Sequence, residues 1–578
     1  MFSLRTLRKA WLPASIAVVM GFAVVASAQV DSPSGQQDDA HFQWPGTWRS
    51  PQDALPTATP IKHLVVIFGE NRSFDHYFGT YPVAANPPGE PAFKAKPWTP
   101  QVDGLTPDLL TQNPNALNPA NGVNAVNPFR LDRTQANTEG QNHSYTPEQQ
   151  AYDNGKADLF PKYTGNNTVS STGTFGTHGL VMGYFDGNTV TAMWNYAQHF
   201  AMDDNAYTDT YGPSTPGAIE VVSGTNNGAK VVLGSASTIP DGQGGLSLIG
   251  DTDPAYDMCS STSSTVMMTS KNIGDLLNAR HITWGGFMGG FDLAAVNANG
   301  STGCTRSTYS NVLGATKTDY VPHHNWFQYY ASTANPTHAR PTSLAEIGYT
   351  DDKDGGATPV HHEYDVQDFF KAVESGNYPS VSYLKAPAVG DAHPGNSDPL
   401  DEQAFVVKVL NFLQRQPDWK NTAVIITYDD SDGWYDHRYA APTTSSFDST
   451  TPQGSVVGAD QLNGPGICNS PDAKQGVGVN GGKVNGRCGP GTRVPFLVIS
   501  PYARENYVDD TRITQASVVR FIEDNWLHGE RIGEGSNDAT TGSIMDMFDF
   551  HRHVGDEHAR TLFLDPDQGT PVRKPWRS

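Results

Sequence analysis

The sequence predicts an α/β fold built on a mostly parallel central sheet. Short apolar runs rich in β-branched residues, at 61–68 and 423–427, are typical of strands buried on both faces. At 401–414 the apolar residues recur every three or four positions, which indicates a helix. Strands that alternate with helices pair in parallel, with helices covering both faces. In such sheets a functional site lies beyond the carboxyl ends of the strands.

Further elements complete this prediction. Strands are expected at 281–284 (before Gly285-Gly286), 381–384 and 494–499. A second helix is expected at 515–527, with Thr514 placed to cap it. Residues 83–140 hold many Asn and Pro residues and little periodicity, so we expect a long excursion over the surface.

The N-terminus has the layout of a secretory signal peptide over residues 1–28. Basic residues at positions 5, 8 and 9 precede an apolar run (14–25) and a small-residue cleavage site at 26–28. The run is shorter than the roughly 20 residues of a spanning helix. We therefore expect export to the periplasm or the medium and no stable membrane insertion. Residues 29–58 are predicted to form a loose polar arm, and residues 59–578 a single catalytic domain.

The charge and the cysteines agree with an exported protein. The formal net charge is −22, and cleavage after residue 28 makes it −25, since three basic residues and no acidic ones are removed. An acidic surface repels nucleic-acid backbones, so no nucleic-acid partner is expected. The even number of cysteines suggests two disulfides, of three possible connectivities. Sequence proximity favours Cys259–Cys304 and Cys468–Cys488.

Two predicted strands end in oxygen-bearing side chains. Glu70 and Asn71 follow the strand at 61–68, and Asp429 and Asp430 follow the strand at 423–427. These are hard ligands of the kind that hold calcium, magnesium or manganese. A capped turn is the alternative for the first pair. A solvated acidic loop, which would include Asp432 and Asp436, is the alternative for the second.

Ser214 is a candidate nucleophile. Pro216 suits the first turn of a helix, so Ser214 falls near the helix start. It could be a plain N-cap residue. It could also be a nucleophile where helix N–H groups focus positive potential on a phosphoryl oxyanion.

Four histidines stand beside Gly, Pro and Asn in predicted loops. Such histidines suit binding of a tetrahedral anion or protonation of a leaving group. Zinc binding is also possible, although no H-E-x-x-H pattern occurs. They are His143, His323, His324 and His393.

Five segments together resemble one bacterial phosphoesterase family. It unites non-haemolytic-type phospholipases C with secreted acid phosphatases that inhibit the respiratory burst. The segments are Gly69–Gly79, Tyr211–Gly217, Val321–Trp326, Asp391–Gln403 and Tyr428–His437. The resemblance implies an alkaline-phosphatase-like α/β/α sandwich with one divalent metal ion: calcium, magnesium, manganese or zinc.

The resemblance also implies roles for individual residues. Ser214 would be the nucleophile, with its oxygen on the metal, and the reaction would pass through a phosphoserine. The four histidines would line the phosphate site, with His143 matching the family pattern only loosely. The protein metal ligands would be Glu70, Asn71, Asp429 and Asp430. If histidinium is the required form, activity should peak below neutrality, because an ordinary histidine titrates near ~6.5.

In two respects the sequence differs from the phospholipase branch of this family. Both differences favour the acid-phosphatase branch and small phosphomonoester substrates. The phospholipase branch usually has a Thr nucleophile followed by Pro-Asn-Arg, whereas this chain reads Ser214-Thr215-Pro216-Gly217-Ala218. That branch also often carries C-terminal β-domains, which are not expected here. The alternatives are a phospholipase C acting on phospholipid headgroups and, less favoured, a non-catalytic binding protein. The oligomeric state is left open.

Overall fold

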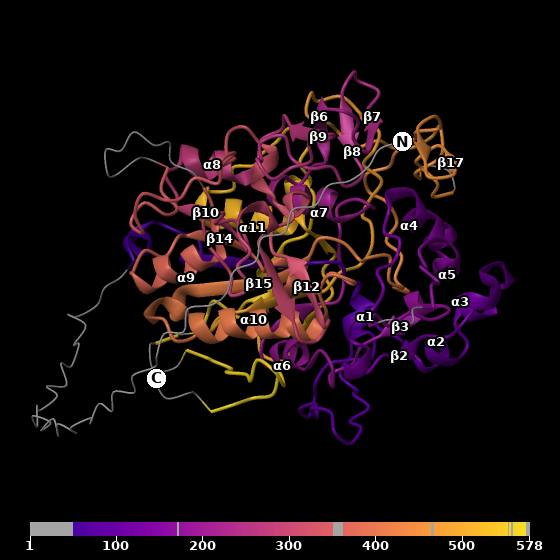
Figure 1. Ribbon diagram of the computed structural model, residues 1–578, viewed down its shortest axis with the longest axis horizontal. Helices are drawn as coiled ribbons and strands as arrows, with labels where there is room; N and C mark the ends of the chain where they lie inside the picture. Colours follow the sequence, from indigo (N-terminus) through magenta and orange to yellow (C-terminus); the bar gives the residue numbers. More distant parts are fainter. Residues whose placement is uncertain are drawn as a thin grey trace, which may run out of the picture. The chain divides into compact units, whose positions relative to one another are not determined.

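An eight-stranded sheet forms the centre of the protein, shown as a computed structural model in Figure 1. β18 runs antiparallel to both of its neighbours, and every other adjacent pair is parallel. The α/β class with a mostly parallel sheet is therefore confirmed. The spatial order is β13 (Glu363–Asp365), β10 (Trp284–Met288), β14 (Val381–Lys385), β1 (His63–Gly69), β15 (Thr422–Tyr428), β18 (Phe496–Ile499), β4 (Ala201–Asp203) and β19 (Tyr507–Asp509).

The structure describes residues 50–169, 173–350, 362–463, 467–552, 554–555 and 559–573. All of them belong to one compact unit that starts at Arg49. The predicted signal peptide (1–28) and residues 29–49 of the predicted arm lie outside the described residues.

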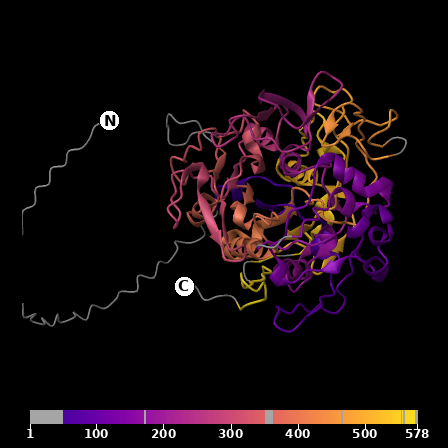
Figure 2. The ribbon, with the colours of Figure 1, turned by 45° about the vertical axis from the view of Figure 1, so that its right-hand side comes forward.

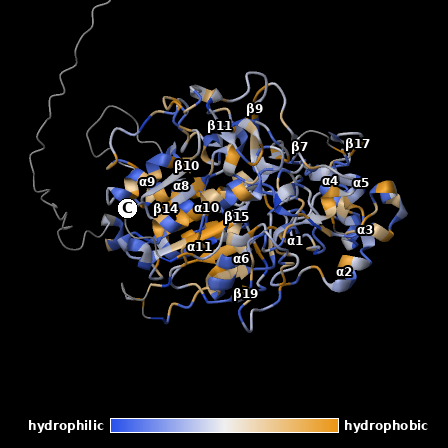
Figure 3. Ribbon diagram, turned by 60° about the horizontal axis from the view of Figure 1, so that its bottom comes forward, coloured by the Kyte–Doolittle hydropathy of each residue, from blue (hydrophilic) through white to orange (hydrophobic). Residues whose placement is uncertain are grey.

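Helices cover the two faces of the sheet (Figure 1). α7 (Ser214–Ser223) and α11 (Ala516–Trp526) pack together on one face, where the Tyr383 hydroxyl donates to the carbonyl of Val221 over 3.3 Å. α10 (Pro399–Leu413) and α6 (Thr191–His199) lie on the other, where α10 packs beside Ile67 and Ile426. Figure 3 shows apolar residues concentrated in β14, β15, α10 and α11. This apolar core holds the strand ends in fixed positions.

The predicted strands and helices are present, with differences at some of their ends. The predicted strand at 281–284 starts only at Trp284 and continues through Gly285 and Gly286, because His281 sits at a φ of 53° in a turn. A Cβ on Gly286 would lie 2.4 Å from a carboxylate oxygen of Glu363 on β13, so a larger residue here would require the Glu363 side chain to move. Thr514 does not cap α11, since its hydroxyl bonds to the hydroxyl of Thr541 at 2.8 Å.

The remaining elements are short and lie mainly in the excursions between core strands. A second, antiparallel sheet was not predicted; its strands are β7 (Thr238–Pro240), β8 (Leu246–Leu248), β6 (Asn227–Leu233) and β9 (Thr265–Met268). The excursion at 83–140 contains α2 (Pro107–Thr111) and α3 (Pro114–Leu117). The others are α1 (Phe74–Phe78), α4 (Tyr145–Tyr152), α5 (Phe160–Tyr163), α8 (Ile273–Ala279), α9 (Val366–Glu374), β2 (Phe129–Arg130), β3 (Gly183–Tyr184), β5 (Ala206–Tyr207), β11 (Ser307–Ser310), β12 (Ala315–Thr318), β16 (Pro452–Gln453), β17 (Val456–Val457) and β20 (Ile513–Thr514).

Segments far apart in the sequence meet at one side of the molecule. Figures 1 and 2 show the early segment around α4 and α5 (indigo to purple) beside the late loops around β17 (orange). The contact is hydrogen-bonded: the Tyr145 hydroxyl donates to Asp460 at 2.6 Å, and the Thr146 hydroxyl donates to the carbonyl of Ala459 at 2.6 Å. The loops that surround the sheet edge therefore form one connected structure.

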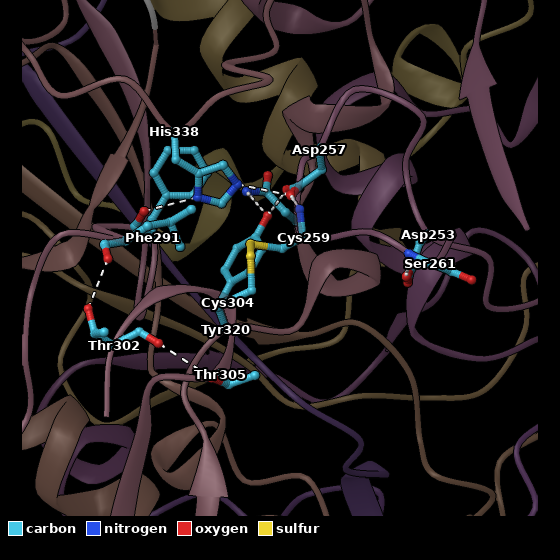
Figure 4. Close-up of a disulfide and its surroundings, with 12 residues drawn as sticks. Asp253, Asp257, Cys259, Ser261, Phe291, Thr302, Cys304, Thr305, Tyr320 and His338 are labelled. Atoms are coloured by element: carbon cyan, nitrogen blue, oxygen red, sulfur yellow. Dashed lines mark hydrogen bonds and ion pairs between the residues drawn. A yellow bond between two sulfur atoms is a disulfide. The ribbon is translucent and has the colours of Figure 1, made fainter. Parts of the chain in front are cut away.

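Both predicted disulfides are present, Cys259–Cys304 and Cys468–Cys488. Figure 4 shows the first beside a buried network in which His338 Nε2 lies 2.9 Å from Asp257 and the Tyr320 hydroxyl donates to the same carboxylate. Asp257, Cys259 and His338 lie close enough together to hold a metal. The Cys259 sulfur is already bonded to Cys304, so this network ties loops together instead.

Among the described residues, no helix combines the length and the apolar character that crossing a membrane requires.

Gly217 allows α7 to approach the end of β15. A Cβ at this position would lie 2.1 Å from the backbone oxygen of Asp429, a distance that no side chain tolerates. At Gly217 the helix that begins at Ser214 therefore approaches the backbone of Asp429 without an intervening side chain.

We predict that Gly217→Ala destabilises the fold by about 1–3 kcal/mol, the usual cost of overpacking a core. The measurement is urea denaturation of the purified variant. Gly555→Ala is the control, because a Cβ there meets nothing within 4 Å. Equal stability of the two variants would show that α7 and the Asp429 loop can separate without cost.

Candidate active site

The ends of β1 and β15 place four polar side chains together. The two strands are parallel neighbours, with Gly69 paired to Tyr428, so Glu70 and Asp429 emerge side by side. Asn71 takes a left-handed φ of 57°, and its backbone N–H donates to Asp429 Oδ1 over 3.0 Å. Its side-chain amide donates to both carboxylate oxygens of Asp430, at 3.0 and 3.1 Å. All four side chains are buried.

Ser214 faces this cluster from the first turn of α7. Pro213 is the N-cap residue of the helix, and no side chain caps it. The alternative that Ser214 is a plain N-cap is therefore wrong. Its hydroxyl lies 3.0 Å from Glu70 Oε2 and 3.1 Å from Asp430 Oδ2 and is almost fully buried. A buried hydroxyl between two carboxylates at a helix start suits a nucleophile that can lose its proton.

The carboxylates of the cluster oppose one another. Burial raises the pKa of Glu70, and Lys385 offsets part of that effect. Burial and then Glu70 raise the pKa of Asp429 well above its ordinary value. Burial, followed by the charge of Asp429, likewise raises the pKa of Asp430 well above its ordinary value. Three carboxylates in contact without water are stable as anions only if cations offset them.

The donor set fits a divalent metal ion. Asn71 Oδ1 and Asp429 Oδ2 are buried and have no hydrogen-bond partner among the described residues. Unpaired buried oxygens are costly, and hard cations are held by carboxylate and amide oxygens of this kind. The residues that would hold the ion are Glu70, Asn71, Ser214, Asp429 and Asp430.

Lys385 is a residue of the site that the sequence did not reveal. It ends β14, is fully buried, and its ammonium forms an ion pair with Glu70 Oε1. Burial alone would lower the pKa of Lys385, but Glu70, Asp429 and Asp391 hold it above its ordinary value. The available signal was a lysine directly after the apolar run Val381–Leu384. A lysine at the end of a buried strand needs an anionic partner.

His324 and His323 approach the cluster from one side. His324 is buried, with Nδ1 3.0 Å from Glu70 Oε1 and 3.7 Å from Asp391 Oδ2. Glu70, His324 and Asp391 could also group around a metal, but the Lys385 ammonium already contacts that carboxylate oxygen of Glu70. Burial, then His323 and Lys385, lowers the pKa of His324 well below its ordinary value, so it is neutral.

His323 differs from His324 in the direction of its pKa shift. Its Nδ1 lies 3.4 Å from Asp253, and its backbone carbonyl oxygen lies 3.3 Å from the Thr215 hydroxyl. Burial would lower the pKa of His323, but the interaction with Asp253 and the charge of Asp251 raise it. His323 is about 29% exposed at its side chain, which leaves it accessible to substrate.

The ring of His393 lies between two others, with its centre 6.1 Å from that of His143 and 6.0 Å from that of His324. His143 Nδ1 is 3.2 Å from Asp432. Burial would lower the pKa of His143, but Asp430 and Asp432 raise it well above its ordinary value. Burial lowers the pKa of His393 to about 4. The structure thus brings all four predicted histidines to the cluster, and the pKa of two of them, His143 and His323, is raised.

The four acidic residues of the Asp429–Asp436 segment do not act together. Asp432 accepts from the backbone of Gln141 at 2.9 Å and contacts His143. Asp436 instead accepts from Arg493 Nε at 3.1 Å, away from the cluster. Of these four acidic residues, only Asp429 and Asp430 belong to the candidate metal site. Asp432 holds a histidine in place.

Glu148 is a second residue that the sequence did not reveal. It is buried in α4 and accepts from the backbone of Gly212 at 2.9 Å and from the Ser431 hydroxyl at 2.8 Å. It therefore joins the loop before Ser214 to the loop after Asp430. Burial and Asp430 raise the pKa of Glu148 to about 8. Nothing in the local sequence distinguishes Glu148 from an ordinary helix-start glutamate.

The site combines a hydroxyl that faces a cluster of oxygen ligands with histidines around it, an arrangement that suits phosphoryl transfer. Comparison with known proteins gives the family. The model of the Phosphoesterase family matches residues 61–527, and the chain belongs to that family. Membership supports the prediction of a hydrolase acting on phosphoric ester bonds.

Relatives with assigned names are phospholipases C. "Non-hemolytic phospholipase C" of Pseudomonas aeruginosa is 24% identical over 85% of this chain and 57% of its own length. The protein of the same name from Burkholderia pseudomallei is 26% identical, over 81% and 55%. "Phospholipase C A" of Mycobacterium tuberculosis is 25% identical, over 85% and 78%. The chain spans little more than half the length of the first two.

A solved structure of a protein in the alkaline phosphatase superfamily, from Vibrio parahaemolyticus, also matches. It covers 67% of this chain and 69% of its own, with 10% identity and a TM-score of 0.26. At that score the match carries no argument about substrate or mechanism.

We predict that Lys385→Met destabilises the metal-free protein by roughly 3–5 kcal/mol, since removing one partner of a buried ion pair leaves the other charge uncompensated. The measurement is urea denaturation in the presence of a chelator. Lys408→Met, on the outer side of α10, is the control. A metal-free Lys385→Met protein as stable as the wild type would mean that Glu70 does not depend on this ammonium.

Proposed function

We propose that this chain is an exported, metal-dependent phosphomonoesterase of the acid-phosphatase type, with residues 59–578 as its single catalytic domain. The observation that carries the proposal is the buried Ser214 hydroxyl, 3.0 Å from Glu70 and 3.1 Å from Asp430. The two disulfides support export, because such bonds persist in oxidising compartments. Periplasm and medium remain alternatives as the destination.

A divalent ion held by Glu70, Asn71, Asp429 and Asp430 would supply Lewis-acid polarisation of phosphoryl oxygens and favour the alkoxide form of Ser214. The Ser214 proton is already directed at a carboxylate, so Glu70 or Asp430 receives it as the oxygen attacks phosphorus. The new Oγ–P bond forms as the bond to the leaving oxygen breaks, which gives a phosphoserine and an alcohol. Water then attacks phosphorus and the Oγ–P bond breaks: the water gives a proton to the histidine that protonated the leaving group, the carboxylate returns its proton to Ser214 Oγ, and inorganic phosphate leaves.

The histidines act on the phosphoryl oxygens and the leaving group. Neighbouring carboxylates raise the pKa of His143 and of His323, which favours their protonated forms, and a protonated imidazole attracts the equatorial oxygens of a phosphate dianion. Either can give its proton to the departing alkoxide. Because the pKa of each lies above its ordinary value, the cationic forms persist to higher pH than an unperturbed histidine would allow. Activity therefore extends further toward neutrality than the sequence suggested.

Phospholipase C activity is the second candidate function. The names of the relatives favour it. Two histidines with a raised pKa instead favour the doubly charged phosphate of a monoester over the singly charged phosphate of a diester. Hydrolysis of p-nitrophenyl phosphate beside p-nitrophenyl phosphorylcholine separates the two: the proposal expects the monoester to be the better substrate. Preference for the choline diester would assign the same residues to a phospholipase C.

We predict that Ser214→Ala lowers kcat for p-nitrophenyl phosphate at least ~10³-fold, because the covalent route is lost. Acid quenching of the wild type with ³²P-labelled substrate should trap label on the peptide that contains Ser214. Ser223→Ala, at the other end of α7, is the control for helix folding. Label on another residue, or turnover by Ser214→Ala near the wild-type rate, would remove Ser214 from the nucleophile role.

We predict that Asp253→Asn moves the alkaline limb of the pH–kcat/KM profile to lower pH. Asp253 raises the pKa of His323, so without its charge the histidine loses its proton at a lower pH. The expected shift is about 0.5–1 unit, typical of one partly exposed charge pair. Asp472→Asn, at an exposed position, is the control. An unchanged profile would show that His323 need not be protonated.

A further inference from the structure

A small pocket lies beside the segment that carries the candidate nucleophile. It has a volume of about 200 Å³, and its wall includes His143 and Pro213. Pro213 directly precedes Ser214, and His143 contacts the Asn71 amide at 3.3 Å. The pocket therefore adjoins the candidate active site. It is smaller than the roughly 300–1,000 Å³ of pockets for drug-sized ligands.

Four separate loops build this pocket. Ser144 precedes α4, Ser237 precedes β7, Asp251 follows β8, and Gln453 lies in β16. Figures 1 and 3 show α4, β7 and β17, the partner strand of β16, near one another at one end of the molecule. None of the four residues lies on the central sheet. Binding loops on a rigid scaffold commonly set specificity in this way.

The four side chains offer free hydrogen-bonding atoms. Asp251 Oδ1 accepts from the backbone and the hydroxyl of Thr215, both at 3.0 Å, which fixes the carboxylate. Its other oxygen has no recorded hydrogen bond within the described residues. The hydroxyls of Ser144 and Ser237 and the side-chain amide of Gln453 also have no hydrogen bond within the described residues. Together they present two hydroxyls, one amide and one acceptor oxygen.

The pocket lacks the surface that a choline group needs. Quaternary ammonium groups are bound mainly by aromatic faces, and no aromatic ring other than the imidazole of His143 is among the described residues that line it. Hydroxyls and amides both donate and accept, which matches a ligand with several hydroxyl groups. We propose that this pocket is a leaving-group subsite for a small polyhydroxylated alcohol, glycerol or a single sugar ring. This inference rests on the proposed phosphomonoesterase function.

The test compares glycerol 3-phosphate with n-propyl phosphate, which has the same carbon count but lacks the two free hydroxyls. The wild type should hydrolyse glycerol 3-phosphate with the higher kcat/KM. Gln453→Ala and Ser237→Ala should each lower the ratio of the two kcat/KM values by roughly two- to tenfold, the value of one hydrogen bond. The change should fall mainly on KM. Gln367→Ala, on the exposed face of α9, should leave the ratio unchanged.

Three outcomes would overturn the inference. Equal kcat/KM values for the two substrates in the wild type would show that the pocket does not recognise hydroxyls. An unchanged ratio in both Gln453→Ala and Ser237→Ala would show that these side chains do not contact the leaving group. Preference for phosphorylcholine over glycerol 3-phosphate would assign the pocket to a cation. Absence of hydrolysis of every monoester, p-nitrophenyl phosphate included, would instead reject the proposed function.

Discussion

The convergence of buried carboxylates at one edge of the sheet is the constraint on which the rest of the structure depends. Glu70 and Asp429 emerge from paired strands, and Asp430 follows at once. Their mutual repulsion in a dry setting would destabilise the fold unless cations and hydrogen-bond donors surround them. Lys385 supplies one buried positive charge, and the backbone N–H of Asn71 supplies one donor. The unpaired oxygens that remain are the basis for proposing a bound metal ion.

The surrounding elements serve to position groups around that edge. α7 approaches through the bare backbone of Gly217 and brings the Ser214 hydroxyl between two carboxylates. Glu148 fixes the loops on either side of this contact. The histidines come from three different excursions, each held by an acidic residue or a backbone carbonyl. The core therefore serves as the scaffold, while the loops determine the charge of the site and the access of substrate to it.

The sequence predicted the parts of the fold that carry strong local signals. Apolar runs located β1, β14 and β15 to within two residues, because burial on both faces leaves an unambiguous pattern. Short strands such as β4 and β19 were missed, since three residues carry no periodicity. The cluster at Glu70 and Asp429 was predictable because both follow such runs. Lys385 and Glu148 were not, because their partners lie far away in sequence and only folding brings them together.

Metal analysis of the purified protein tests the central claim most directly. Elemental analysis before and after exhaustive chelation, with activity on p-nitrophenyl phosphate followed in parallel, would show whether the carboxylate cluster holds an ion. The account predicts one divalent ion per chain, loss of activity when that ion is removed, and recovery when it is restored. Full activity in protein shown to contain no divalent metal would contradict it.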